Sequence, residues 1–124
     1  MPTAAKLTVA KHRNNLKALR AETEARLANL ERGYDELAVT GDDVGAGDDE
    51  GGSEADVSVV ERDRLRAQAG EARNVLAAID AAEERASSRG WELCRLCGEP
   101  IGHERLDALP TADTCVSCKA RQAW

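Results

Sequence analysis

The chain has 124 residues, 32% of them charged, with no Phe, two Trp and one Tyr. This shortage of aromatic side chains argues against a thick two-layer core and favours helices that bury narrow Ala and Leu stripes. The net charge is −6, and seven acids without a base fall within residues 41–56, which leaves 16 acids against 17 bases elsewhere. Without a cluster of Lys and Arg, direct nucleic-acid binding and membrane-surface binding are disfavoured.

The first segment, from about residue 3 to residue 38, has the periodicity of one long helix. Apolar or tolerated side chains recur in steps of three and four residues, which is typical of a helix with a single narrow seam. The seam positions are Val9, His12, Leu16, Leu19, Thr23, Leu27, Leu30, Tyr34 and Leu37.

Residues 39–53 interrupt this pattern with Gly and Asp, which predicts an acidic loop. A second helix is expected over about 54–88, and Gly90 is suited to follow its end. Its seam is Leu65, Ala69, Ala72, Leu76, Ile79, Ala82 and Ala86. Two helices of similar length, each with one seam, favour an antiparallel coiled-coil hairpin within a monomer. Pairing between chains in an oligomer is the alternative.

Four cysteines give the strongest local signal. Two C-x2-C pairs, Cys94 with Cys97 and Cys115 with Cys118, stand seventeen residues apart. This spacing predicts one structural zinc with four thiolate ligands and no open position for water. A disulfide framework, a redox C-x-x-C and an iron–sulfur cluster are the alternatives. With four cysteines available, His103 is expected at a turn or surface and His12 in the seam.

The predicted fold is therefore mainly α. It comprises a helical hairpin over residues 1–90 and a four-cysteine zinc finger with a short C-terminal helix over residues 91–124. We expect Trp91 to pack between the finger and the hairpin. The cysteine usage and the absence of a signal peptide or a long apolar run favour a cytoplasmic protein without a membrane span.

The finger resembles that of the DksA/TraR family. The resemblance runs from Cys94 to Lys119, and its specific parts are Gly-Glu-Pro-Ile-Gly (98–102), Arg105-Leu106 and Pro-Thr-Ala-Asp (110–113). It implies a non-enzymatic transcription regulator that binds bacterial RNA polymerase. In such proteins the coiled coil enters the secondary channel, acidic tip residues lie near the active site, and the finger docks at the rim. Here the tip acids are Asp48, Asp49, Glu50, Glu54 and Asp56, and the rim residues are Arg105 and Lys119.

The tip and one finger position depart from the family pattern. The best-known members carry Asp-x-x-Asp-x-Ala at the tip, for which Glu54-Ala55-Asp56 is the nearest counterpart. Some members also bind the alarmone ppGpp, but Leu109 occupies one of the basic positions used for that purpose. We therefore expect a weak ppGpp response or none.

The sequence is also compatible with other functions. The main alternative is an adaptor in which zinc holds the finger and the coiled coil binds another protein. In that case the acidic segment over residues 39–53 is only a solvated loop. A DNA-binding finger lacks a basic stripe, and an enzyme lacks an open metal site, a nucleophile–base pair and a phosphate loop.

Overall fold

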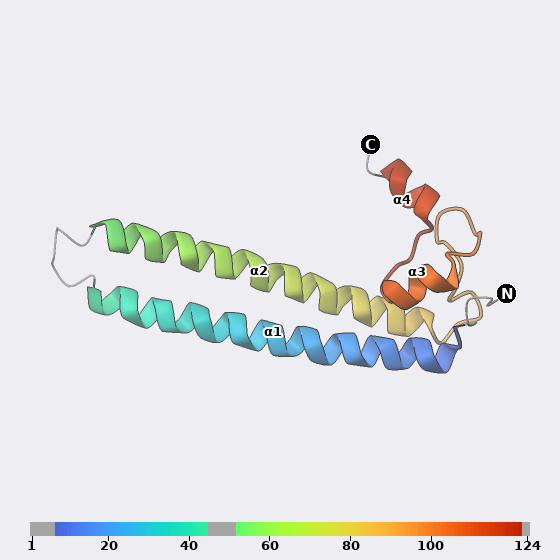
Figure 1. Ribbon diagram of the computed structural model, residues 1–124, viewed down its shortest axis with the longest axis horizontal. Helices are drawn as coiled ribbons and strands as arrows, with labels where there is room; N and C mark the ends of the chain where they lie inside the picture. Colours follow the sequence, from blue (N-terminus) through green and yellow to red (C-terminus); the bar gives the residue numbers. More distant parts are fainter. Residues whose placement is uncertain (1–6, 45–51, 123–124) are drawn as a thin grey trace. The chain divides into compact units, whose positions relative to one another are not determined.

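The computed structural model describes residues 7–44 and 52–122, and the side chains of residues 7–37 and 58–122. Its four helices are α1 (Val9–Val44), α2 (Gly52–Arg85), α3 (His103–Ala108) and α4 (Val116–Gln122), shown in Figure 1. Over these described residues the only bridge outside helices is an isolated antiparallel one between Leu93 and Pro100. The fold is mainly α, as the sequence predicts.

The ends of the two long helices differ from the sequence prediction. Helix α1 continues to Val44, through residues 39–44 that were expected in the loop. Each residue added to an existing helix gains a hydrogen bond without a new nucleation cost, so a helix can continue through residues of low propensity. Helix α2 ends at Arg85. The chain then forms tighter turns, in which the amides of Ser87 and Ser88 donate to carbonyls three residues back.

The chain divides into two compact units, and α1 and α2 contribute to both. Unit 1 contains residues 1–21 and 75–124, and unit 2 contains residues 22–74. In each unit the α1 and α2 segments run side by side in opposite directions, as Figure 1 shows. The antiparallel hairpin is thus confirmed, whereas the predicted domain boundary at residue 90 stays a prediction.

Unit 1 has two apolar clusters. The first joins Leu16 of α1 to Ile79 and Ala82 of α2, with Leu19 and Leu76 beside them, and both Leu16 and Ile79 are fully buried. Burying a side chain of this size contributes about 1.5–3 kcal/mol. The second cluster belongs to the finger and consists of Leu7, Cys94, Ile101, Leu106 and Cys118, with Trp91, Ala112 and Cys115 packed against it.

Unit 2 has a thinner core. Thr23 of α1 and Ala69 and Ala72 of α2 are buried, and Leu65 lies 3.5 Å from where a Cβ on Gly33 would stand. These are the seam positions expected from the sequence, but small side chains occupy several of them. In the described part of the chain, no helix has an apolar stretch long enough to cross a bilayer.

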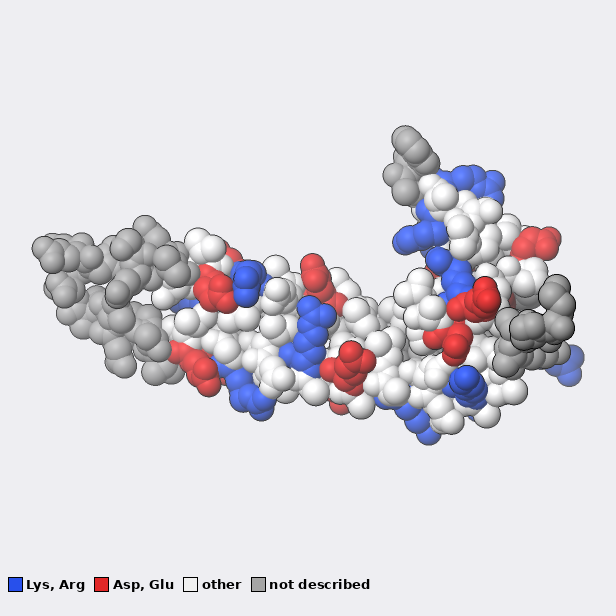
Figure 2. Space-filling model, viewed as in Figure 1, with Lys and Arg blue, Asp and Glu red and all other residues white. Residues whose placement is uncertain are grey.

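Charged side chains of both signs are interspersed along α1 and α2 on the face shown in Figure 2. In unit 1, Arg20 of α1 joins α2 through ion pairs with Asp80 and with Glu83, the latter at 2.7 Å. These hydrogen bonds raise the pKa of Arg20 above its usual value. Along α1 and α2 on this face, the described basic side chains alternate with acidic ones.

Candidate metal centre

The first cysteine pair lies in a tight turn. The amide of Gly98 donates to the carbonyl of Cys94 (2.9 Å), and the amide of Cys94 donates to the carbonyl of Glu99 (2.8 Å). Gly98 adopts φ 77°, a left-handed conformation that glycine accepts without the steric cost of a Cβ. This turn directs both thiols of the pair to the same side.

The second cysteine pair spans the start of α4. Cys115 immediately precedes the helix, and its carbonyl accepts the amide of Lys119 at 2.9 Å, so Cys118 lies in the first turn. The Sγ atoms of all four cysteines lie within 4.8 Å of one another, and those of Cys97 and Cys115 are 3.8 Å apart. The fold has thus brought together the four cysteines that the sequence singled out.

The sulfur positions fit zinc. A tetrahedral site with Zn–S bonds of about 2.3 Å separates its sulfurs by about 3.8 Å. Disulfides would need sulfurs about 2.05 Å apart, and the four cysteines are free thiols in this structure. Cys94, Cys97, Cys115 and Cys118 would hold the metal, which when bound links the two turns as a closed structural centre.

Without metal, the thiols differ in acidity. Burial raises the pKa of Cys94, but amides of Cys97, Cys115 and Leu96 donate to it and lower its pKa overall to about 6. Burial and the neighbouring cysteines raise the pKa of Cys118 to about 12. Because zinc binds thiolates, metal binding must displace protons, most of all from Cys118.

Two arginines hold the loops around the sulfurs. Arg95 donates from Nε to Asp113 Oδ2 at 2.8 Å, and its amide donates to the Asp113 carbonyl at 2.9 Å. Arg105 donates from Nε to the Thr114 carbonyl at 3.0 Å. Asp113 and Thr114 immediately precede the second cysteine pair, so both arginines help to position it.

His103 joins the finger to the start of the chain. Its Nδ1 accepts the amide of Leu7 at 2.6 Å, and its Nε2 lies 2.7 Å from Glu92 Oε2. With Nδ1 as an acceptor, the proton of the neutral ring is on Nε2, which donates to the carboxylate. Both nitrogens are therefore engaged away from the sulfurs, and His103 is not a fifth ligand.

Trp91 connects the finger cluster to α1, as predicted. It packs against the finger cluster and stacks on His12 with ring centroids 4.8 Å apart. His12 is buried within the seam, also as predicted, and burial followed by the nearby charge of Arg85 lowers its pKa.

The remaining predicted site residues are placed as follows. Asp48, Asp49 and Glu50 lie outside the described residues, and Glu54 and Asp56 lie on α2 with side chains outside the described ones. Lys119 is exposed on α4, over which basic side chains gather in Figure 2, and Arg105 is half-buried at α3. The tip and rim roles stay predictions.

Comparison with known proteins supports this description. Residues 87–122 match the family described as prokaryotic dksA/traR C4-type zinc finger. The solved structure of transcription factor DksA2 from Pseudomonas aeruginosa superposes with a TM-score of 0.77, at 26% identity, covering 99% of this chain and 91% of that one.

The finger of this chain is of the DksA/TraR C4 type.

A curated relative agrees with this match of the finger. The RNA polymerase-binding transcription factor DksA of Haemophilus influenzae is 40% identical over 47 residues, which make up 38% of this chain and 32% of the relative. The four-cysteine cluster of this DksA/TraR finger is accordingly a structural zinc centre.

Sequence reasoning missed the contacts that support this centre. The sequence alone indicates only a turn or surface position for His103, and no structural role for Arg95 or for Asp113. An acidic residue such as Glu92 near the cysteines is a weak indication that His103 has a carboxylate partner. Nothing in the spacing of the sequence indicates that the amide of Leu7 donates to the same imidazole ring.

Proposed function

We propose that this chain is a transcription regulator that binds bacterial RNA polymerase. The observation that carries the proposal is the likeness to DksA2 over 99% of this chain, since it includes the hairpin as well as the finger. The name of the Haemophilus influenzae relative states polymerase binding, and we extend that property to this chain.

In this proposal the hairpin enters the secondary channel of the polymerase. The segment that joins α1 to α2 contains the acids Asp48, Asp49 and Glu50, and the first turns of α2 add Glu54 and Asp56. Carboxylates near the catalytic centre change the local field felt by nucleotides and metal ions. The regulator would then act without promoter contacts, and the mixed signs of the described charges along α1 and α2 in Figure 2 are consistent with this proposal.

The finger would dock at the channel rim. Lys119, exposed in the last turn of α4, would meet an acidic surface, whereas Arg105 would act partly by holding the Thr114 loop in place. We propose a monomeric, cytoplasmic protein with a weak ppGpp response or none, because Leu109 supplies no charge for a phosphate.

The experiment separates binding from regulation. Glu54→Gln with Asp56→Asn is compared with Glu71→Gln and Glu84→Gln, two exposed acids elsewhere on α2 that give the same change in charge. The tip variant should bind core polymerase like the parent and lose the effect on initiation in a transcription assay. The control variant should keep both. A tip variant that regulates as well as the parent would contradict the tip mechanism.

A further inference from the structure

Two arginines of unit 2 converge on one phenol. Arg62 and Arg66 lie one turn apart on α2, and their guanidinium carbons stand 5.2 and 5.4 Å from the ring centroid of Tyr34 on α1. Both donate to the Tyr34 hydroxyl oxygen, Arg66 at 2.6 Å and Arg62 at 3.4 Å. These hydrogen bonds and charges lower the pKa of Tyr34, as expected beside concentrated positive charge.

Arg62 and Arg66 share a phenol as hydrogen-bond partner, whereas their neighbour on α2 pairs with a carboxylate. Arg73, on the same helix, donates to Glu31 Oε2 at 3.0 Å. The Nε of Arg62 is buried without a hydrogen-bond partner among the described residues, so it is closed to an incoming anion, and the exposed guanidinium of Arg66 offers the accessible donors. Two guanidinium groups that share one neutral hydroxyl leave donors and positive charge available for an anion.

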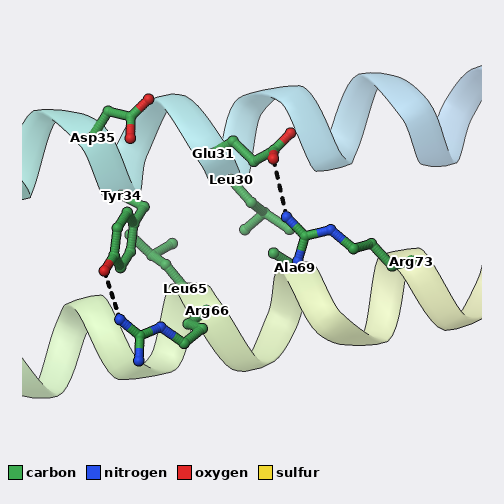
Figure 3. Close-up of a pocket in the computed structure, with 8 residues that line it drawn as sticks. All are labelled: Leu30, Glu31, Tyr34, Asp35, Leu65, Arg66, Ala69 and Arg73. Atoms are coloured by element: carbon green, nitrogen blue, oxygen red, sulfur yellow. Dashed lines mark hydrogen bonds and ion pairs between the residues drawn. The ribbon is translucent and has the colours of Figure 1, made fainter.

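A cavity of about 360 Å³ adjoins this cluster, drawn in Figure 3. Leu30, Leu65 and Ala69 give it apolar walls, and two polar bridges cross between the helices, Tyr34 with Arg66 and Glu31 with Arg73. Arg66 is exposed at this cavity, so its guanidinium can be reached by a ligand from solvent.

Neighbouring acids restrict the anion that fits. Asp35 lines the same cavity, and Asp63 interacts electrostatically with Arg66. A polyphosphate would meet these negative charges with several of its own, whereas a single carboxylate presents two oxygens and one charge to the guanidinium groups.

We propose that Arg62 and Arg66, held by Tyr34, bind a carboxylate side chain of the protein on which the hairpin docks. The inference rests on the proposed function, because that protein is taken to be RNA polymerase. It adds a specific recognition point on the hairpin that uses neither the tip acids nor the rim residues.

The test replaces the planar groups and keeps the charge. Arg62→Lys with Arg66→Lys removes the fork that pairs two oxygens of a carboxylate but preserves net charge. Arg26→Lys with Arg64→Lys is the matched control, since both arginines are exposed in unit 2. Affinity for core RNA polymerase is measured by titration at fixed salt, and circular dichroism checks that each variant folds.

We expect the Arg62 and Arg66 variant to bind at least about tenfold more weakly and the control to bind like the parent. Tyr34→Phe, which keeps both arginines but removes the hydroxyl, should give an intermediate loss. Equal affinities for the parent and the Arg62 and Arg66 variant would overturn the inference and leave the proposed function intact. A parent that does not bind polymerase would overturn the proposed function, and the inference with it.

Discussion

His12 shows how one buried side chain makes stability depend on pH. It is 3% exposed, stacks on Trp91, and its Nδ1 has no hydrogen-bond partner among the described residues. Burial and Arg85 lower its pKa, so the folded chain binds this proton less readily than the unfolded chain, whose histidine titrates near 6.5. The unfolded state therefore gains stability as the pH falls through that value.

We predict that His12→Phe reduces this dependence, because Phe can stack on Trp91 but does not titrate. Urea unfolding is measured at several values between about pH 8 and about pH 6. The parent should lose more free energy of unfolding over this range than the variant. All other ionisable groups are the same in the two proteins, so the difference reports His12. Parallel profiles would show that His12 has no such effect.

Replacing glycine by alanine should have opposite effects on stability at Gly70 and at Gly98. Gly70 lies inside α2, and a Cβ there would meet nothing within 4 Å. Gly70→Ala should raise the free energy of unfolding by about 0.5–1 kcal/mol. Gly98 has φ 77°, so Gly98→Ala should destabilise the zinc-bound finger by about 1–2 kcal/mol. Thermal melts with zinc present test both, and a destabilising Gly70→Ala would contradict the assigned helix.

At the scale of the elements, the α1–α2 seam supplies the stability of the hairpin in unit 1. Leu16→Ala should lower the free energy of unfolding by about 2–5 kcal/mol, because Leu16 is fully buried against Ile79. Val60 is 67% exposed on α2, so Val60→Ala should change the free energy of unfolding by less than about 0.5 kcal/mol. Urea unfolding of the two variants makes the comparison, and equal losses would argue against the seam.

The seam could be predicted from the sequence because helical periodicity depends only on local spacing. Leu16, Ile79 and Ala82 are buried at the predicted steps, although Val9, also assigned to the seam, is 37% exposed at the first turn of α1. The helix ends were less predictable. The low-propensity residues near the end of α1 do not stop a helix that is already formed.

In the finger, too, local spacing predicts some features and not others. The C-x2-C spacing predicted the ligand set, because two thiols in one turn and two in another suffice for a tetrahedron. The supporting contacts of His103 with Leu7, 96 positions away, and of Arg95 with Asp113 depend on which loops meet in space. No local pattern encodes such pairings.

For the whole molecule, zinc is expected to hold the finger and leave the long helices in place. Cys94 and Cys118 form part of the finger cluster with Leu106, and α1 and α2 retain their own contacts at Leu16 and Ile79. A chelator, or Cys115→Ser, should therefore expose Trp91 while most of the helical circular dichroism persists.

Fluorescence in a Trp124→Phe background tests this prediction, because Trp91 is then the single tryptophan. Its emission should shift to the red on zinc removal and return when zinc is added back. Lower pH should ease the loss of metal, since protons compete for the thiols and burial raises the pKa of Cys118 to about 12. Unchanged emission after complete metal removal would show that the finger cluster holds without zinc.

The account as a whole depends on polymerase binding. The most direct measurement is the affinity of the zinc-loaded chain for core RNA polymerase, with and without an unrelated protein that occupies the secondary channel. We predict saturable one-to-one binding that the competitor abolishes. Absence of binding would contradict the proposed function and favour an adaptor for another protein, and binding that the competitor leaves unchanged would contradict insertion into the channel.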